Sequence, residues 1–184
     1  MLKRFKMDAA RWIVPQQVAD LALVRLGTVL RLLWNHLPLQ AMLWFRLGCW
    51  CRAKHIPLGG IIQRLIATFY GLEIPVGNDY GGGLYIAHPY GTVIAAKSMG
   101  ENCSIIAAVT IGMRNEWAFP TLGSRVIIGA GARVLGGIHV GDDAVIGANA
   151  VVIEDVPAGA TVVGIPGRVT RIYGKRVEQR NEEA

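Results

Sequence analysis

The sequence predicts a mainly β protein, a parallel β-helix preceded by an α-helical segment. Three observations predict this fold. An aliphatic residue recurs every six positions in the C-terminal half, glycine and other small residues stand between these positions, and the first 72 residues follow a helical pattern instead. The recurring positions are Leu122, Ile128, Val134, Val140, Ile146 and Val152. A period of six is typical of coils in which three short strands and their turns close a triangle.

The same register extends toward the N-terminus through Ile74, Tyr80, Ile86, Val93, Met99, Ile105 and Ile111. The step from Ile86 to Val93 is seven, which predicts one inserted residue beside His88. The step from Ile111 to Leu122 is eleven, which predicts a loop that protrudes between two strands. We therefore expect a β-helix over 73–173, with a protruding loop at 112–121 and a polar tail at 174–184.

Residues 1–72 are expected to form helices. When successive residues are spaced about 100° apart, the polar side chains from Gln17 to Asn35 fall on one arc and the rest are mostly apolar. Proline residues at 38 and 57 predict further helices near 39–54 and 59–71. Their outer polar faces are expected to carry arginine and lysine, namely Arg46, Arg52, Lys54 and Arg64. Two interpretations stay open: contact with an anionic membrane surface, or packing against the same chain or a sister subunit.

Composition narrows the compartment and the class of partner. The net charge of +6 favours an anionic partner, but no arginine-rich tract or zinc-finger spacing is present, so nucleic acid is not expected. Cys49, Cys51 and Cys103 are odd in number and predict no disulfide framework, which is typical of a cytoplasmic protein. The longest uncharged N-terminal run, 32–45, is shorter than the ~20 residues of a spanning helix.

Two stretches resemble the hexapeptide-repeat acyltransferases, most closely their serine acetyltransferase branch. They are GLEIPVGNDYGGGLYIAHPYGTVI at 71–94 and IGAGARVLGGIHVGDDAVIGANAVVIEDVPAGATVVGIPGRV at 128–169. The helical stretch 44–75 is similar to shorter relatives of exopolysaccharide and capsule pathways. The resemblance implies a left-handed β-helix that assembles as a homotrimer. It also implies active sites between neighbouring subunits, acetyl-CoA as donor and a hydroxyl group as acceptor.

The resemblance places the catalytic general base at His88, since an imidazole can hold and release a proton at neutral pH. Glu73 matches the carboxylate that orients this imidazole, which is an aspartate in the serine enzymes. The two residues are 15 positions apart, close to one coil of about 18. Spacing alone leaves open that they are two unrelated polar residues.

The donor-binding positions also follow from the resemblance. Ala130, Ala148 and Ile153 match positions whose backbone meets the pantetheine arm, where small residues let the arm lie close to the coil. Arg168 matches a basic position near the CoA phosphates. Taken individually, the alanines can equally be corners of the coil.

Two positions depart from the serine enzymes. Phe119 replaces a histidine of the protruding loop, and Ala87 replaces an aspartate that precedes the catalytic histidine. Apolar side chains cannot compensate the desolvation of a zwitterion. We therefore expect Ala87, Phe119 and the neighbouring Trp117 to line a cleft for a sugar ring, although Trp117 and Phe119 can also pack at a subunit interface.

The expected protein is thus a cytoplasmic acetyl-CoA-dependent O-acetyltransferase that acts on a saccharide in polysaccharide biosynthesis. The N-terminal helices would contact the inner face of an anionic membrane. Serine O-acetyltransferase and a non-catalytic β-helical scaffold are the alternatives. No metal site is expected, because the coils hold only two histidines, His88 and His139.

Overall fold

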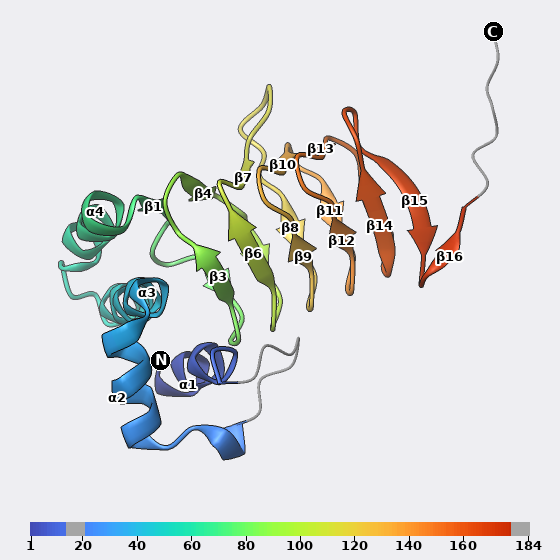
Figure 1. Ribbon diagram of the computed structural model, residues 1–184. Coiled ribbons are helices and arrows are strands. Elements are labelled where there is room, and N and C mark those ends of the chain that lie inside the picture. The colour runs from blue at the N-terminus through green and yellow to red at the C-terminus, as the bar shows by residue number, and fades with distance from the viewer. Residues whose placement is uncertain (14–20, 178–184) are drawn as a thin grey trace, which may run out of the picture.

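The computed structural model describes residues 1–13 and 21–177. A group of helices lies at one end of the molecule, and a solenoid of short strands extends from it (Figure 1). The helical elements are α1 (Leu2–Ala10), a 3-10 turn (Leu21–Leu23), α2 (Leu26–Asn35), α3 (Leu37–Ala53) and α4 (Gly59–Tyr70).

Three sheets form the walls of the solenoid, and each of the first four coils contributes one strand to each wall. The five-stranded wall contains β1 (Leu72–Glu73), β4 (Thr92–Ile94), β7 (Thr110–Gly112), β10 (Arg133–Leu135) and β13 (Val151–Val152). The four-stranded wall contains β2 (Asp79–Tyr80), β5 (Ser98–Met99), β8 (Thr121–Leu122) and β11 (His139–Val140). The seven-stranded wall contains β3 (Tyr85–His88), β6 (Ser104–Ala107), β9 (Ile127–Ile128), β12 (Val145–Ile146), β14 (Ala160–Val163), β15 (Arg168–Ile172) and β16 (Lys175–Arg176).

Neighbouring strands up to β14 pair in parallel, which confirms the predicted β-helix, and the hexapeptide repeats fit the left-handed form. One register position is wrong. Val93 pairs with Thr110 and is only half-buried, whereas Ile94 pairs with Ile111 and is fully buried. The core position after Ile86 is therefore Ile94, so the insertion beside the histidine is two residues rather than one.

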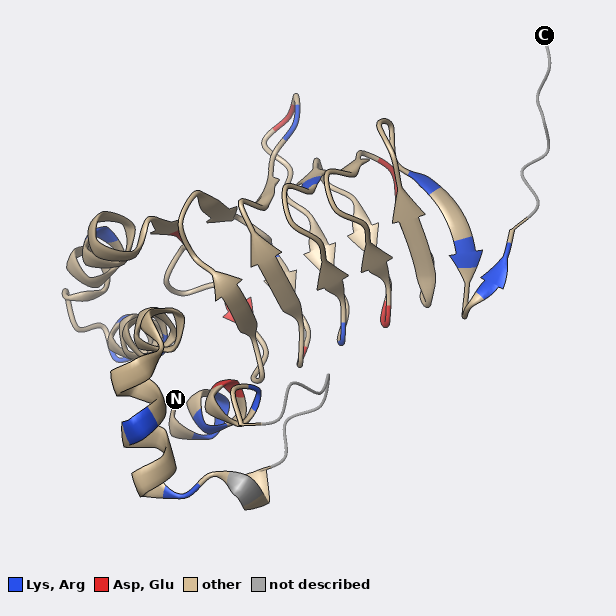
Figure 2. Ribbon diagram, viewed as in Figure 1, with Lys and Arg blue, Asp and Glu red and all other residues tan. Residues whose placement is uncertain are grey.

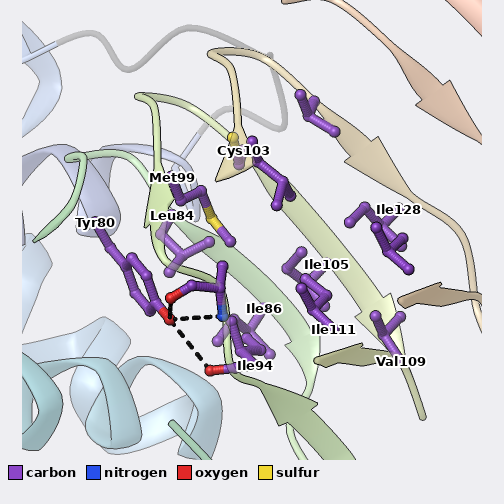
Figure 3. Close-up of a cluster of buried hydrophobic side chains, with 14 of the residues drawn as sticks. Tyr80, Leu84, Ile86, Ile94, Met99, Cys103, Ile105, Val109, Ile111 and Ile128 are labelled. Carbon is purple, nitrogen blue, oxygen red and sulfur yellow. Dashed lines mark hydrogen bonds between the residues drawn. The ribbon is translucent and has the colours of Figure 1, made fainter. Parts of the chain in front are cut away.

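Tyr80 can occupy an aliphatic position of the first coil because its hydroxyl finds partners inside the core (Figure 3). The hydroxyl lies 2.8 Å from the carbonyl oxygen of Ala96 and 3.2 Å from that of Ile94, and it accepts the Ala96 N–H at 3.1 Å. Burial raises the pKa of Tyr80 to about 12, so the phenol stays protonated and remains a donor. Its ring lies 5.8 Å from that of Phe45 in α3, which joins the helices to the coil.

A buried ion pair fixes the helices against the first coil. Arg46 of α3 lies 2.8 Å from Asp8 of α1, and its guanidinium also donates to the carbonyl oxygens of Tyr80 and Gly81. Asp8 accepts a further hydrogen bond from the Leu84 N–H at 2.9 Å. Burial raises the pKa of Asp8, and the Arg46 guanidinium opposes that rise. Both side chains are almost inaccessible to solvent. The buried ion pair therefore links the N-terminal helices to the first coil of the β-helix.

The predicted helix from Gln17 to Asn35 is shorter in the structure. Residues 17–20 lie outside the described residues, and α2 begins only at Leu26, after the 3-10 turn. The helices predicted near 39–54 and 59–71 are present as α3 and α4. The last helix ends at Tyr70, and the first strand begins at Leu72.

The chain reverses its direction at the C-terminal end of the seven-stranded wall. Strand β15 pairs antiparallel with β14, and β16 pairs antiparallel with β15. The predicted polar tail at 174–184 therefore begins with a strand, and its residues 178–184 lie outside the described residues. Among the helices that the structure describes, none is both long and apolar enough to cross a bilayer.

Candidate active site

His88 lies at the edge where the seven-stranded and five-stranded walls meet. It is the last residue of β3 and is exposed, and the turn that follows it leads into β4. Thr92 closes this turn, since its hydroxyl donates to the His88 carbonyl at 3.2 Å and its N–H donates to the Pro89 carbonyl at 3.0 Å. Thr92 is fully buried. The hexapeptide pattern did not identify it, because threonine is common in strands.

A column of small residues rises above His88 along the same edge. His88 pairs with Ala107, and continuing the strand registers of β6, β9 and β12 places Ala130 and then Ala148 above it. Ala130 is half-buried and Ala148 is exposed. We call this edge, with the 88–91 turn, the histidine corner. Three of the proposed site residues therefore share one surface, on which an extended ligand arm could lie flat.

One cation at this corner was not found from the sequence. The Arg133 guanidinium, from β10, donates to the carbonyl oxygens of Ala108 and Gly131, at 2.6 and 3.0 Å. The repeat pattern treats Arg133 as an ordinary outward residue of a strand. Its position beside the alanine column makes it a second basic group available to an anionic ligand, in addition to Arg168.

Glu73 lies on the neighbouring wall rather than beside His88. It ends β1, pairs with Val93 and is exposed. No hydrogen bond or ion pair joins Glu73 to His88 within residues 1–13 and 21–177. Its role as the group that orients the imidazole stays a prediction.

The protruding loop stands at a different edge, where the five-stranded wall meets the four-stranded wall (Figure 1). It connects β7 to β8. Trp117 is 82% exposed, and its ring meets that of Phe119 edge-on at 5.4 Å. A pocket of about 240 Å³ lies under the loop, with Ile153 and Ile138 in its lining. Ile153 is thus placed with the loop and not with Ala130 and Ala148.

Arg168 begins β15 and is exposed. Its guanidinium lies 3.7 Å from the Glu154 carboxylate, in a pair open to solvent. Such a pair contributes little to stability, so the arginine could exchange this partner for a phosphate.

A cysteine nucleophile is not supported by the geometry. Cys103 is buried in the core, and burial raises its pKa to about 11. Burial also raises the pKa of Cys49. The thiolate form of either residue is therefore scarce at neutral pH. The described residues also hold no group of three or more His, Cys, Asp or Glu side chains suited to a metal ion.

The solenoid with hexapeptide repeats and an exposed histidine at one edge defines a class of transferase. Residues 119–154 match the family described as bacterial transferase hexapeptide (six repeats). The chain belongs to the hexapeptide-repeat acyltransferases.

Within this class, the chain belongs to the serine acetyltransferase family. The serine acetyltransferase of Staphylococcus aureus is 34% identical to this chain over an alignment 184 positions long. The alignment covers 96% of this chain and 82% of that protein. The enzyme of Synechococcus elongatus is 39% identical, and the alignment covers 76% of this chain and 59% of that enzyme. The enzyme of Helicobacter pylori is 46% identical, and the alignment covers 56% of this chain and 63% of that enzyme. The chain thus spans about three fifths of the length of these last two relatives.

Solved structures agree with the sequence relatives. The serine acetyltransferase of Neisseria gonorrhoeae superposes with a TM-score of 0.78 at 27% identity, covering 97% of this chain and 68% of that chain. The soybean apoenzyme gives a TM-score of 0.74 at 30% identity, covering 90% and 66%.

The expectation of a saccharide acceptor in polysaccharide biosynthesis is wrong. The relatives and structural neighbours are serine acetyltransferases, and the expected closer likeness to exopolysaccharide and capsule enzymes is not supported. Within one chain, Ala87 lies at the histidine corner and Phe119 at the loop edge, with the five-stranded wall between them. The two side chains can therefore line a common cleft only across a contact between two subunits.

Proposed function

We propose that this chain is an acetyl-CoA-dependent serine O-acetyltransferase. The observation that supports it most strongly is the likeness to the Staphylococcus aureus serine acetyltransferase over 96% of the chain. The structure of the Neisseria gonorrhoeae enzyme in complex with serine, with a TM-score of 0.76, supports serine as acceptor. The exposed histidine beside a column of small residues suits transfer from a thioester on a long, narrow arm.

His88 would act as general base. Its imidazole accepts the proton of the serine hydroxyl while the serine oxygen attacks the carbonyl carbon of the thioester. The carbon–sulfur bond then breaks, and the imidazolium returns the proton to the sulfur of CoA. A positioned base of this kind contributes about 10²–10⁴ in rate. Thr92 holds the backbone of the His88 turn and so acts as a positioning residue.

The remaining proposed roles concern the donor and the orientation of the base. The alanine column would receive the pantetheine arm, with Arg168 and Arg133 available to the CoA phosphates. Glu73 would orient the imidazole, which requires its side chain to reach from the neighbouring wall. We further propose that the chain assembles as a homotrimer. The histidine corner and the protruding loop lie at opposite edges of the five-stranded wall, so only a neighbouring subunit can bring a loop to His88.

The test is release of CoA from acetyl-CoA by the full-length protein with free serine as acceptor. His88→Ala should lower kcat by about 10²–10⁴. The matched control is His139→Ala, because His139 is also exposed but lies on the four-stranded wall, with its ring 3.1 Å from the Thr121 hydroxyl. That variant should keep full activity. Unchanged activity in His88→Ala would refute the mechanism.

The same assay tests the acceptor and the departure at position 87. Acetyl transfer to serine supports the proposal, whereas transfer to oligosaccharides but not to serine would exclude it. Ala87→Asp restores the carboxylate that the resemblance expects beside the base and should lower the KM for serine. A protein that binds no acetyl-CoA in calorimetry would instead be a non-catalytic scaffold.

A further inference from the structure

Two helices at the N-terminal end expose regular apolar stripes. On α2 the stripe consists of Leu26, Leu30 and Trp34, which are 77%, 60% and 88% exposed. On α4 it consists of Ile61, Leu65 and Phe69, which are 55%, 41% and 67% exposed. Residues four apart lie on one side of a helix, so each stripe runs about 12 Å along its axis.

These stripes are not the faces that hold the helices in the fold. The inner side of α2 packs through Leu32 and Val29 against α1 and α3, and that of α4 packs through Ile62 and Ile66 into the main core. The exposed stripes therefore represent additional apolar surface on the single chain. Exposed apolar side chains that recur along a helix and are flanked by charged residues favour an interaction site.

The charge around these stripes has one sign. Residues 1–72 contain ten of the 19 Lys and Arg residues but two of the 13 Asp and Glu residues, so this segment has a net charge of +8 and the rest of the chain −2. Of the two acids, Asp8 is buried and Asp20 lies outside the described residues. The exposed cations of the segment are Lys3, Arg4, Lys6, Arg25, Arg31, Arg52, Lys54 and Arg64.

Figure 2 shows how the charges are arranged along the molecule. Lys and Arg recur along the helices and again on β15 and β16 at the other end, whereas Asp and Glu occur mainly on the coils between them. Arg31 follows Leu30 directly on α2, and Arg64 precedes Leu65 on α4. Long cationic side chains beside an apolar stripe can reach toward headgroups while their stems lie on apolar surface. One correction applies: Arg46, expected on the outer polar face, is buried with Asp8 and is not available.

We propose that the apolar stripes of α2 and α4 and the cations beside them bind the surface of an anionic lipid bilayer. The leucine, tryptophan and phenylalanine side chains enter the boundary between headgroups and acyl chains, and the arginines pair with lipid phosphates. Contact of this type needs only short helices that lie in the plane of the interface. The function proposed above does not depend on it.

Charge favours a bilayer over a second copy of the same surface. Two copies docked through the stripes would bring two segments of net charge +8 together, with no exposed carboxylate among residues 1–13 and 21–72 to compensate. Like charges placed together at an interface disfavour the complex. An anionic surface instead gains from every cation.

The test is co-sedimentation of the full-length protein with vesicles of phosphatidylcholine containing 30% phosphatidylglycerol, a composition chosen to supply negative charge. We expect binding to these vesicles, much weaker binding to pure phosphatidylcholine, and loss of binding in 0.5 M salt, which screens the charges. Each Lys or Arg near such a surface contributes about fivefold to partitioning, so Arg25→Gln, Arg31→Gln and Arg64→Gln together should lower it about a hundredfold.

The stripes are tested by Leu26→Ser, Leu30→Ser and Trp34→Ser, changed together because all three side chains are exposed. We expect at least a tenfold loss of partitioning with unchanged circular dichroism. The matched control is Val163→Ser with Tyr173→Ser, two exposed apolar residues at the far end of the β-helix, which should partition like wild type. Equal partitioning of the stripe variant and the control would overturn the proposal. So would a lower sedimentation mass of the stripe variant without lipid, which would assign the surface to contact between copies.

Discussion

Replacing Tyr80 by phenylalanine tests whether one buried hydroxyl stabilises the first coil. The change leaves the ring in place and removes only the oxygen. The Ala96 N–H loses its acceptor, which lies 3.1 Å away, while the Ala96 carbonyl keeps its hydrogen bond from the Asn78 side chain at 2.7 Å. Ala96 is fully buried, so water does not replace the acceptor. A buried donor without a partner costs about 1–3 kcal/mol, and we expect that loss in the free energy of unfolding.

The measurement is urea unfolding at equal protein concentration, extrapolated to water. Tyr85→Phe is the matched control, because Tyr85 is half-buried and its hydroxyl has no hydrogen-bond partner among the described residues. That variant should change the unfolding free energy by less than about 0.5 kcal/mol. If both variants lose the same stability, or Tyr80→Phe loses none, the hydroxyl does not act as described.

Two further predictions concern ion pairs. Asp8→Ala leaves the Arg46 charge buried with carbonyl partners alone and should lower the free energy of unfolding in urea by about 3–5 kcal/mol. Asp79→Ala breaks an exposed pair and should lower it by less than about 1 kcal/mol. Equal losses in the two variants would contradict the role of burial. The hydrogen bond from Arg125 lowers the pKa of Asp143 below its ordinary 3.8. The unfolded state therefore binds more protons in acid than the folded state does. The stabilisation that the ionised Asp143 side chain gives the folded state is present above pH 3.8 and disappears as pH falls through the lowered pKa. Unfolding free energies of wild type and Asp143→Asn should accordingly converge below that pH, and parallel curves would refute the assignment.

The fold could be predicted from the sequence because the repeat acts at every coil. Each inward position must be apolar to stack on the coil below, so the register is visible from Ile74 to Val152. It failed beside His88, where the turn is irregular and the pattern alone cannot distinguish Val93 from Ile94. The helical pattern also assigned Arg46 to an outer polar face, whereas Arg46 is buried with Asp8. It did not identify Arg11, which is buried and donates to the Asn102 carbonyl at 2.7 Å.

The candidate site was predictable only where it follows the repeat. His88, Ala130 and Ala148 occupy equivalent positions in their coils, and the structure aligns them along one edge. The same site was expected to include Ile153, Trp117 and Phe119. Their positions depend on the edge of the solenoid from which the protruding loop extends, and the six-residue period does not predict that edge. The identity of the acceptor could not be derived from Ala87 and Phe119, because the apolar character of two side chains does not define which hydroxyl compound binds beside them.

The reversal of the chain at β15 also limits polymerisation. A parallel β-helix has no internal feature that sets the number of its coils, and the last strand exposes hydrogen-bonding groups to which any similar strand could add. In this protein that edge on the seven-stranded wall is occupied by β15, which runs in the opposite direction, and the helices cover the first coil at the other end. The 168–176 hairpin therefore caps this wall of the solenoid and helps to prevent molecules from joining end to end into fibres.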